Sequence, residues 1–415
     1  MQISTGFIKI AKISFLFSSA SPSTLLALLP LAFCASVFDI DANEDLDEAG
    51  FEETFGLEKV TDPEEYKKRE EALKANEELV KESNAKFRAG EETWWDKINE
   101  LSDLPEDEFE ANKTGELMPG GEFGRGLLHP SDSADRIDEV SERYFDQFCY
   151  SRADVPTSYS SVDEGNVSPV QNQGSCGSCV AFANMALVET CFKKVTGVFG
   201  DYSEQQFLDC GYGQNGASGC NGAYGYSYAK WAETNGSSLS HESQYTYQDT
   251  DTTGVCPSSL EYYNQGVKIS SAYYTYNADE ETMKALVYAN GAVGTGVNAD
   301  TGFGEYSGGV YAGCTSTDTN HAVTVVGYGT EDGVDYWLVK NSWGDSWGDS
   351  GYIKVQRGVN MCGIGSLMVT VDCEEVAGVT DSPLTTAAPC TDTYSNCADL
   401  CSYVPDDCKK SCGGC

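Results

Sequence analysis

The sequence predicts an α+β protein with two sub-domains, because one clear helix pattern is followed by several strand patterns and the chain is long enough to hold both. The chain has 415 residues, of which 40% are hydrophobic, so one domain of about 220 residues with appendages can bury a sizeable core. A helix-like apolar periodicity covers Cys179–Lys194. The strand-like runs come later, at Ala292–Val297, His321–Tyr328, Tyr336–Lys340 and Gly351–Gln356.

The net charge excludes two classes of partner. It is −39 at pH 7. Nucleic acids and anionic membrane surfaces both require a basic face, so we expect neither as a partner. The acidic balance is equally consistent with simple solubility and with an enzyme that works in an acidic compartment.

The N-terminus and the cysteine content indicate the secretory pathway. Lys9 and Lys12 precede an apolar run that ends in LLALLPLAFCAS, and the small residues at its end resemble a signal-peptidase site, so we expect residues 1–36 to be a signal peptide. A membrane anchor is the weaker alternative, because Ser18–Thr24 interrupts the apolar run with polar residues. Seventeen cysteines favour an oxidising compartment, either outside the cell or in a lysosome or vacuole. No later segment has the 18 apolar residues of a membrane span, so we expect no membrane anchor in the mature form.

Changes in composition divide the rest of the chain. A charged helix is expected over residues 60–90, and a Gly-rich and then Ser/Asp-rich stretch at 115–140 reads as a linker. Three N-x-[ST] sequons, at Asn112, Asn166 and Asn235, fit a secreted glycoprotein. We expect a leader at 37–153, a main domain at 154–376, a linker at 377–389 and a six-cysteine module at 390–415.

The most informative stretch is QNQGSCGSCVAFANMALVETCFKK, residues 171–194. A Gly/Ser-rich loop runs into the helix pattern, which places Cys179 at the start of a helix. The partial positive charge of a helix N-terminus lowers the pKa of a thiol, so Cys179 is the candidate nucleophile. The alternative is that Cys176 and Cys179 form a metal or redox pair. The sequence offers neither the second C-x-x-C of a zinc site nor the preceding strand of a redox motif, and we expect no metal and no cofactor.

A thiol nucleophile needs a general base, and the chain has three histidines. His129 lies in the leader and His241 in a polar loop, whereas His321 stands at the mouth of a probable buried strand. Asn341 follows in DYWLVKNSWGDSWGDSGYIKV and can fix the orientation of the imidazole, with Trp343 shielding that bond from water. The alternatives are a structural histidine and an ordinary Asn-Ser-Gly hairpin turn.

Together these segments closely resemble the papain/cathepsin family of cysteine peptidases. CGSCV at 176–180 matches the family signature, the histidine and asparagine follow at the family's distances, and NSWG-x-x-WG-x-x-GY is matched at 341–352. The resemblance implies a papain-like fold with a helical half and a β-barrel-like half. It also implies an endopeptidase in which Gln173 and the Cys179 N–H form the oxyanion hole.

The resemblance extends to substrate-binding residues and disulfides. An apolar pocket floor at Leu367 implies preference for an apolar residue two positions before the cut. Two usual family residues are replaced, a tryptophan by Val180 and a glycine by Ala223. The implied substrate-binding residues are Gly222, Ala223, Tyr224, Leu367 and Trp343. The implied disulfides are Cys176–Cys220, Cys210–Cys256 and Cys314–Cys362. Of the cysteines then left over (Cys149, Cys191 and Cys373), we expect Cys191 to be a buried core residue.

The leader resembles the ERFNIN-type inhibitory propeptide of the same family, with the alternative of a plain solvated helix. We expect it to inhibit the enzyme at neutral pH and to be released by acid. The positions that match, which share one helical face, are Glu65, Arg69, Leu73, Asn76, Val80 and Asn84.

The tail resembles the small six-cysteine domain of sea-anemone potassium-channel toxins (ShKT-type). The Lys-Tyr pair of the toxins is missing, so a tether, targeting or docking module is expected rather than a channel blocker. The implied pairing is Cys390–Cys415, Cys397–Cys408 and Cys401–Cys412.

The sequence thus predicts a monomeric cysteine endopeptidase made as a zymogen, acting on proteins or peptides and inhibited by its own propeptide. The alternative is an inactive papain-like scaffold that presents the cysteine-rich tail.

Overall fold

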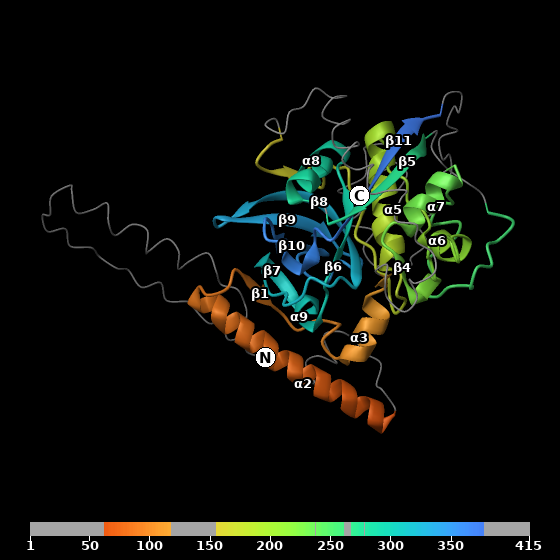
Figure 1. Ribbon diagram of the computed structural model, residues 1–415. Helices are drawn as coiled ribbons and strands as arrows, with labels where there is room; N and C mark the ends of the chain where they lie inside the picture. The colour runs from red at the N-terminus through yellow and green to blue at the C-terminus, as the bar shows by residue number, and fades with distance from the viewer. Residues whose placement is uncertain (1–61, 118–154, 237, 261–266, 278, 377–415) are drawn as a thin grey trace, which may run out of the picture. The chain divides into compact units, whose positions relative to one another are not determined.

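The structure is a computed structural model that describes residues 62–117 and 155–376, apart from 237, 261–266 and 278 (Figure 1). All of these residues belong to one compact unit, Leu46–Cys415. The predicted signal peptide, the linker at 377–389 and the six-cysteine tail lie outside the described residues, as do His129 and Cys149. Within the described ranges, no helix is long and apolar enough to cross a membrane.

The predicted helix after the Gly/Ser-rich loop is α5 (Cys179–Thr196), the centre of a helical sub-domain. Most of its residues are apolar and buried, which is typical of a helix that is covered on nearly all sides. It packs against α6 (Glu204–Cys210) and α7 (Ser227–Thr234) on one side and against strand β8 (His321–Glu331) on the other (Figure 1). The first residue of α5 is therefore held rigidly at the junction of the helices and the sheet.

The second half is built on a mixed sheet whose strands correspond to all four predicted runs, and the α+β prediction is confirmed. Within this sheet the strand pairings are antiparallel, except that β10 and β7 run parallel. The short β3 (Tyr159–Ser160) pairs with β8 off the main path. The main path runs β1 (Trp94–Asp96), β7 (Tyr306–Tyr311), β10 (Tyr352–Gln356), β9 (Val334–Lys340), β8, β6 (Val293–Val297), β11 (Leu367–Glu375) and β5 (Val267–Tyr276).

Strand β8 separates two cores. Ala322 and Val326 join the apolar cluster around α5, whereas Val323 and Val325 join a second cluster with Trp337. This alternation follows from the two-residue period of a strand, whose successive side chains point to opposite faces. Both faces are covered, so the residues at the start of β8 are shielded from water. The remaining short elements are η2 (Gly219–Asn221), β4 (Ala223–Tyr224), α8 (Glu280–Asn290), α9 (Thr301–Gly304) and η3 (Met361–Gly363).

The leader forms α2 (Pro63–Ala89), β1, α3 (Glu106–Lys113) and β2 (Glu116–Leu117). Asp62 accepts hydrogen bonds from two backbone N–H groups at the start of α2, and the proline that follows suits the first position of a helix. The expectation of a helix over residues 60–90 is confirmed for its described part.

The matched face of α2 contacts the segment of the leader that follows it, from β1 to α3. Leu73, Asn76, Val80 and Asn84 are all buried. Asn76 Nδ2 donates to the Ser102 carbonyl at 2.9 Å, and Asn84 Nδ2 donates to the Asp96 carbonyl at 2.9 Å. At the start of the stripe, the Arg69 guanidinium pairs with three carboxylates, those of Glu65, Asp103 and Glu108. These residues on one face of α2 thus fix the chain between β1 and α3.

The structure contains four disulfides among the described residues. Three are the pairs that the resemblance implied, Cys176–Cys220, Cys210–Cys256 and Cys314–Cys362. The fourth pairs Cys191 with Cys373 and joins α5 to β11. The expectation that Cys191 is a buried core residue is therefore wrong, because its side chain is only half-buried and bonds Cys373 on the neighbouring strand. Within the described part, Cys179 is the one cysteine with a free thiol.

The Cys191–Cys373 bridge is expected to stabilise the protein strongly, because it closes a long loop of 182 residues in the unfolded chain. Removing both cysteines by Cys191→Ala and Cys373→Ala should lower the free energy of unfolding by about 2–4 kcal/mol. Denaturant unfolding followed by circular dichroism measures this change. An unfolding midpoint equal to that of the parent chain would show that this bridge contributes nothing.

Candidate active site

Cys179 is the first residue of α5, and its side chain is 0% exposed. Its Sγ accepts a hydrogen bond from the Ala322 backbone N–H at 3.4 Å, which brings it to the residue next to His321. Burial raises the pKa of the thiol to about 12, the Ala322 N–H opposes this rise, and the Glu116 carboxyl adds to it. The expected lowering of this pKa by the helix N-terminus does not hold while the leader covers the site, because loss of solvation outweighs it.

His321 is the first residue of β8 and is also fully buried. Its Nε2 lies 2.7 Å from Asn341 Oδ1, so this ring nitrogen donates to the amide oxygen. The ring stacks on Trp343, with 4.6 Å between the ring centroids and 26° between the planes. Burial lowers the pKa of His321 to about 4, which the Asn341 bond partly offsets and the charge of Lys113 reinforces. The imidazole is therefore neutral in this form.

The other ring nitrogen of His321, Nδ1, makes no hydrogen bond to any residue that the structure describes. It is the nitrogen opposite the one that Asn341 holds, so it is free to exchange a proton with a group on the Cys179 side. His241, by contrast, lies in a loop where its Nδ1 bonds Ser243 at 2.9 Å.

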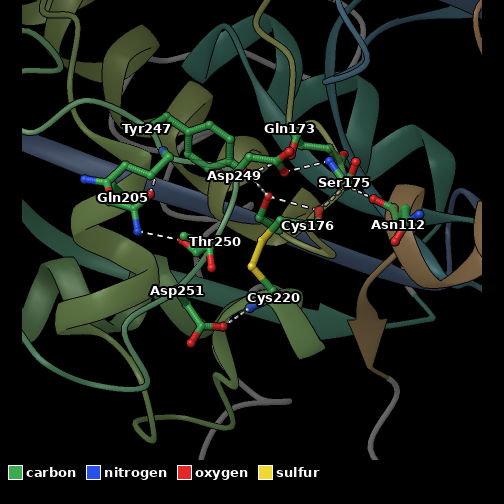
Figure 2. Close-up of a disulfide and its surroundings, with 12 residues drawn as sticks. Asn112, Gln173, Ser175, Cys176, Gln205, Cys220, Tyr247, Asp249, Thr250 and Asp251 are labelled. Carbon is green, nitrogen blue, oxygen red and sulfur yellow. Dashed lines mark hydrogen bonds between the residues drawn. A yellow bond between two sulfur atoms is a disulfide. The ribbon is translucent and has the colours of Figure 1, made fainter. Parts of the chain in front are cut away.

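Gln173 is 0% exposed and is held at both ends of its amide. Its Oε1 accepts from the Ser342 hydroxyl at 2.7 Å, and its Nε2 donates to the Cys176 carbonyl at 3.1 Å. The same Nε2 lies 3.5 Å from the Asn112 carbonyl of the leader (Figure 2). A carbonyl oxygen thus already rests against the amide donor.

Figure 2 shows how the loop before α5 is fixed. The Cys176–Cys220 disulfide ties it to η2, and the Asp249 carboxylate accepts from the Ser175 backbone N–H at 2.6 Å. The Asp251 carboxylate holds the Cys220 N–H at 2.7 Å. These bonds position the loop that carries Gln173 and Cys179.

The five predicted substrate-binding residues all meet the last described residues of the leader, 113–117. Strand β2 pairs in parallel with β4, and the Ala223 N–H donates to the Gly115 carbonyl at 2.9 Å. Gly222 has φ +96°, and a Cβ built on it would overlap that carbonyl, so a glycine is required there. Trp343 Nε1 donates to the Lys113 carbonyl at 3.1 Å. Tyr224 pairs with Leu117, and Leu367 lies by the Glu116 side chain against Gly225.

Two contributors to the site were missed by sequence reasoning. Ser342 holds the Gln173 amide, and its only signal was its place beside Asn341 in the NSWG motif. Glu116 fills a pocket beside Leu367, and an acidic residue in an acidic leader gives no signal at all. No group of three or more His, Cys, Asp or Glu in the described part is arranged to hold a metal ion.

A buried thiol at a helix N-terminus, beside an imidazole held by an amide and under a strand of the chain's own leader, is a site of the thiol hydrolase type. The family model described as papain family cysteine protease matches residues 155–371. Cysteine proteinase 2 of Zea mays is 43% identical over 49% of this chain and 56% of its own length. Thiol protease aleurain of Arabidopsis thaliana is 34% identical over 74% of this chain and 79% of its own length.

Comparison with solved structures indicates the same family. A solved structure titled as digestive procathepsin L2 proteinase from Tenebrio molitor larval midgut is 32% identical, with a TM-score of 0.65 over 78% of this chain and 98% of that one. The chain belongs to the papain family of cysteine proteases, and its papain-like α+β fold is confirmed.

Proposed function

We propose that the chain is the zymogen of a cysteine endopeptidase, with Cys179 as nucleophile and His321 as general acid and base. The observation that carries this proposal is the hydrogen bond between His321 Nε2 and Asn341 Oδ1, at 2.7 Å, beside the thiol of Cys179. It fixes the ring so that Nδ1 remains available for the thiol proton. Trp343 covers the bond and keeps water away from it.

Removal of the leader readmits water and substrate to the cleft, and the Cys179 proton passes to His321. The resulting thiolate attacks the peptide carbonyl carbon and forms a C–S bond, while the carbonyl oxygen takes the negative charge. Gln173 Nε2 and the Cys179 N–H stabilise that oxyanion. His321 gives its proton to the leaving amine as the C–N bond breaks. Water then attacks the acyl-enzyme, its proton goes to His321, and the thiolate is released with the acid product.

The leader supports the zymogen assignment through its contacts. Its residues 113–117 lie along the same five residues that are expected to bind substrate, and the Asn112 carbonyl lies against Gln173. A polypeptide substrate cannot enter while they remain. We infer that residues 37–153 act as an inhibitor in the same chain.

Leu367 at the floor of the pocket supports preference for an apolar residue two positions before the cleaved bond. Val180 and Ala223 are both buried, so these two family departures change local packing rather than the catalytic groups. The cysteines and the expected signal peptide support a destination outside the cell or in a lysosome or vacuole.

The test is active-site labelling with an epoxide thiol trap. Protein freed of residues 37–153 should take up one equivalent, and Cys179→Ser should take up none. The uncleaved chain should label far more slowly, because its thiol is buried and protonated. Processed protein that folds but is not labelled would favour the alternative of an inactive scaffold.

A further inference from the structure

One buried side chain of the leader has no role in the mechanism above. Glu116 lies in β2 and is only 5% exposed. Its carboxyl occupies a space left by two glycines, since a Cβ on Gly296 would overlap Oε2 and a Cβ on Gly225 would lie 2.8 Å from Oε1. Leu367 borders the same space at Gly225. These three residues form what we call the Glu116 pocket.

The carboxyl is poorly solvated in this pocket. Neither of its oxygens has a hydrogen-bond partner among the residues that the structure describes, and the same holds for the nearby hydroxyl of Thr319. Burial raises the pKa of Glu116 to about 8, and the influence of the Thr319 hydroxyl, which favours the charged form, is smaller. A carboxylate without hydrogen bonds in such a place is costly, so the neutral acid is the form that fits.

No cation compensates for the charge among the groups that the structure describes around it. The titratable groups that interact with Glu116 from neighbouring elements are the Cys179 thiol at the start of α5 and the Tyr276 phenol at the end of β5, and its carboxylate raises the pKa of both. The imidazole of His321, at the start of β8, is neutral. Lys113, three residues before Glu116, donates instead to the Gly174 carbonyl at 2.7 Å.

We propose that Glu116 is a proton-dependent plug, which as a neutral acid fills the pocket beside Cys179 and on ionisation loosens the grip of the leader on the cleft. Backbone bonds next to it would open with it: the Glu116 N–H donates to the Asn320 carbonyl at 2.9 Å, and the Ala223 N–H donates to the Gly115 carbonyl at 2.9 Å. The contact itself does not depend on catalysis. Its consequence, exposure of the cleft when Glu116 ionises, rests on the proposed function.

The direction with pH follows from linkage. A group whose pKa is higher in the folded than in the unfolded state contributes its stability fully below the unfolded value and loses it as the pH rises toward the folded value. For Glu116 the two values are the ordinary 4.5 and about 8. The plug therefore holds in acid and weakens toward neutral pH. This contribution of one side chain opposes the acid release expected for the leader as a whole, and comparing Glu116→Gln with its parent isolates it.

Hydrogen exchange of the Ala223 amide tests the proposal in the full chain carrying Cys179→Ser, which can neither cleave itself nor form a thiolate. This chain is the parent, and adding Glu116→Gln keeps the shape of the side chain and removes its charge. At pH 5 the Ala223 amide should exchange at similar rates in the parent and in the Glu116→Gln variant. At pH 8 it should exchange at least about tenfold faster in the parent. Comparing the two chains at each pH removes the intrinsic pH dependence of exchange.

Two further variants complete the test. Glu116→Leu, whose side chain suits a pocket bordered by Leu367, should protect the Ala223 amide at both pH values. Glu110→Gln, at an exposed position of α3, should behave like the parent chain. A ratio of rates between parent and Glu116→Gln that is the same at pH 5 and pH 8 would overturn the proposal. So would faster exchange in both Glu116→Gln and Glu116→Leu at pH 8. Neither outcome depends on whether the processed protein is a peptidase.

Discussion

Replacing His321 by alanine in the processed enzyme is expected to lower kcat/KM by about 10⁴-fold, the upper end of what a general acid and base contributes. In the proposed mechanism, His321 takes the proton of Cys179 and delivers it to the leaving amine. Without the imidazole the thiol stays neutral, and the amine must leave as an unprotonated anion. Steady-state cleavage of a fluorogenic peptide with an apolar residue two positions before the cut measures the loss.

His241 supplies the matched control. It lies in a loop and bonds Ser243, so His241→Gln should leave kcat/KM within about twofold of the parent, as expected for a residue away from the site. Circular dichroism should show that His321→Ala still folds, since its loss of activity is meaningful only then. A folded His321→Ala enzyme that retains a tenth of the parent activity would remove His321 from the mechanism.

The second large effect is expected from Gln173→Ala, which should reduce kcat by about 10²–10³-fold and leave KM nearly unchanged. The Nε2 donor is preorganised, because the Ser342 hydroxyl holds the other end of the amide at 2.7 Å. Charge develops on the substrate oxygen mainly in the transition state, so the loss belongs to kcat. The measurement is the separate determination of kcat and KM on the processed enzyme.

Gln173→Ala also has a readout that separates oxyanion binding from a damaged nucleophile. The variant should still be labelled by the epoxide trap at Cys179, because that reaction forms no tetrahedral oxyanion on a carbonyl. Gln244→Ala, at an exposed position, is the matched control and should leave both constants unchanged. Equal loss in kcat and in labelling would mean that Gln173 supports the loop around Cys179 and does not bind the oxyanion.

Much of the site was predictable because its residues stand at the ends of elements with clear periodicity. Cys179 begins a helix whose apolar pattern is unmistakable, and His321 begins a strand with covered faces. The local hydrophobic pattern therefore predicts that each of these two side chains stands at the start of its element. Their meeting depends on α5 packing against β8, which only the family resemblance could supply before the structure.

The rest depended on tertiary contacts that leave no local trace. Cys191 looked like a core residue because the helix around it is apolar, and its pairing with Cys373 follows only from the position of β11. The rise in the pKa of Cys179 is likewise a property of the covered cleft and not of the helix terminus. Glu116 is buried, whereas the acids of α3 that precede it in the chain, Glu106, Asp107 and Glu110, are exposed, so the acidic composition of this segment gave no sign of its insertion.

Strand β1 of the leader covers one edge of the large sheet. It pairs with β7, and Trp94 of β1 lies against Tyr311 of β7 with 5.2 Å between the ring centroids. Loss of the leader turns β7 into an edge strand, with backbone donors and acceptors open to any extended chain that can align beside them. In the proposed activation, loss of the leader thus opens the cleft and also exposes a sheet edge to which another extended chain can pair.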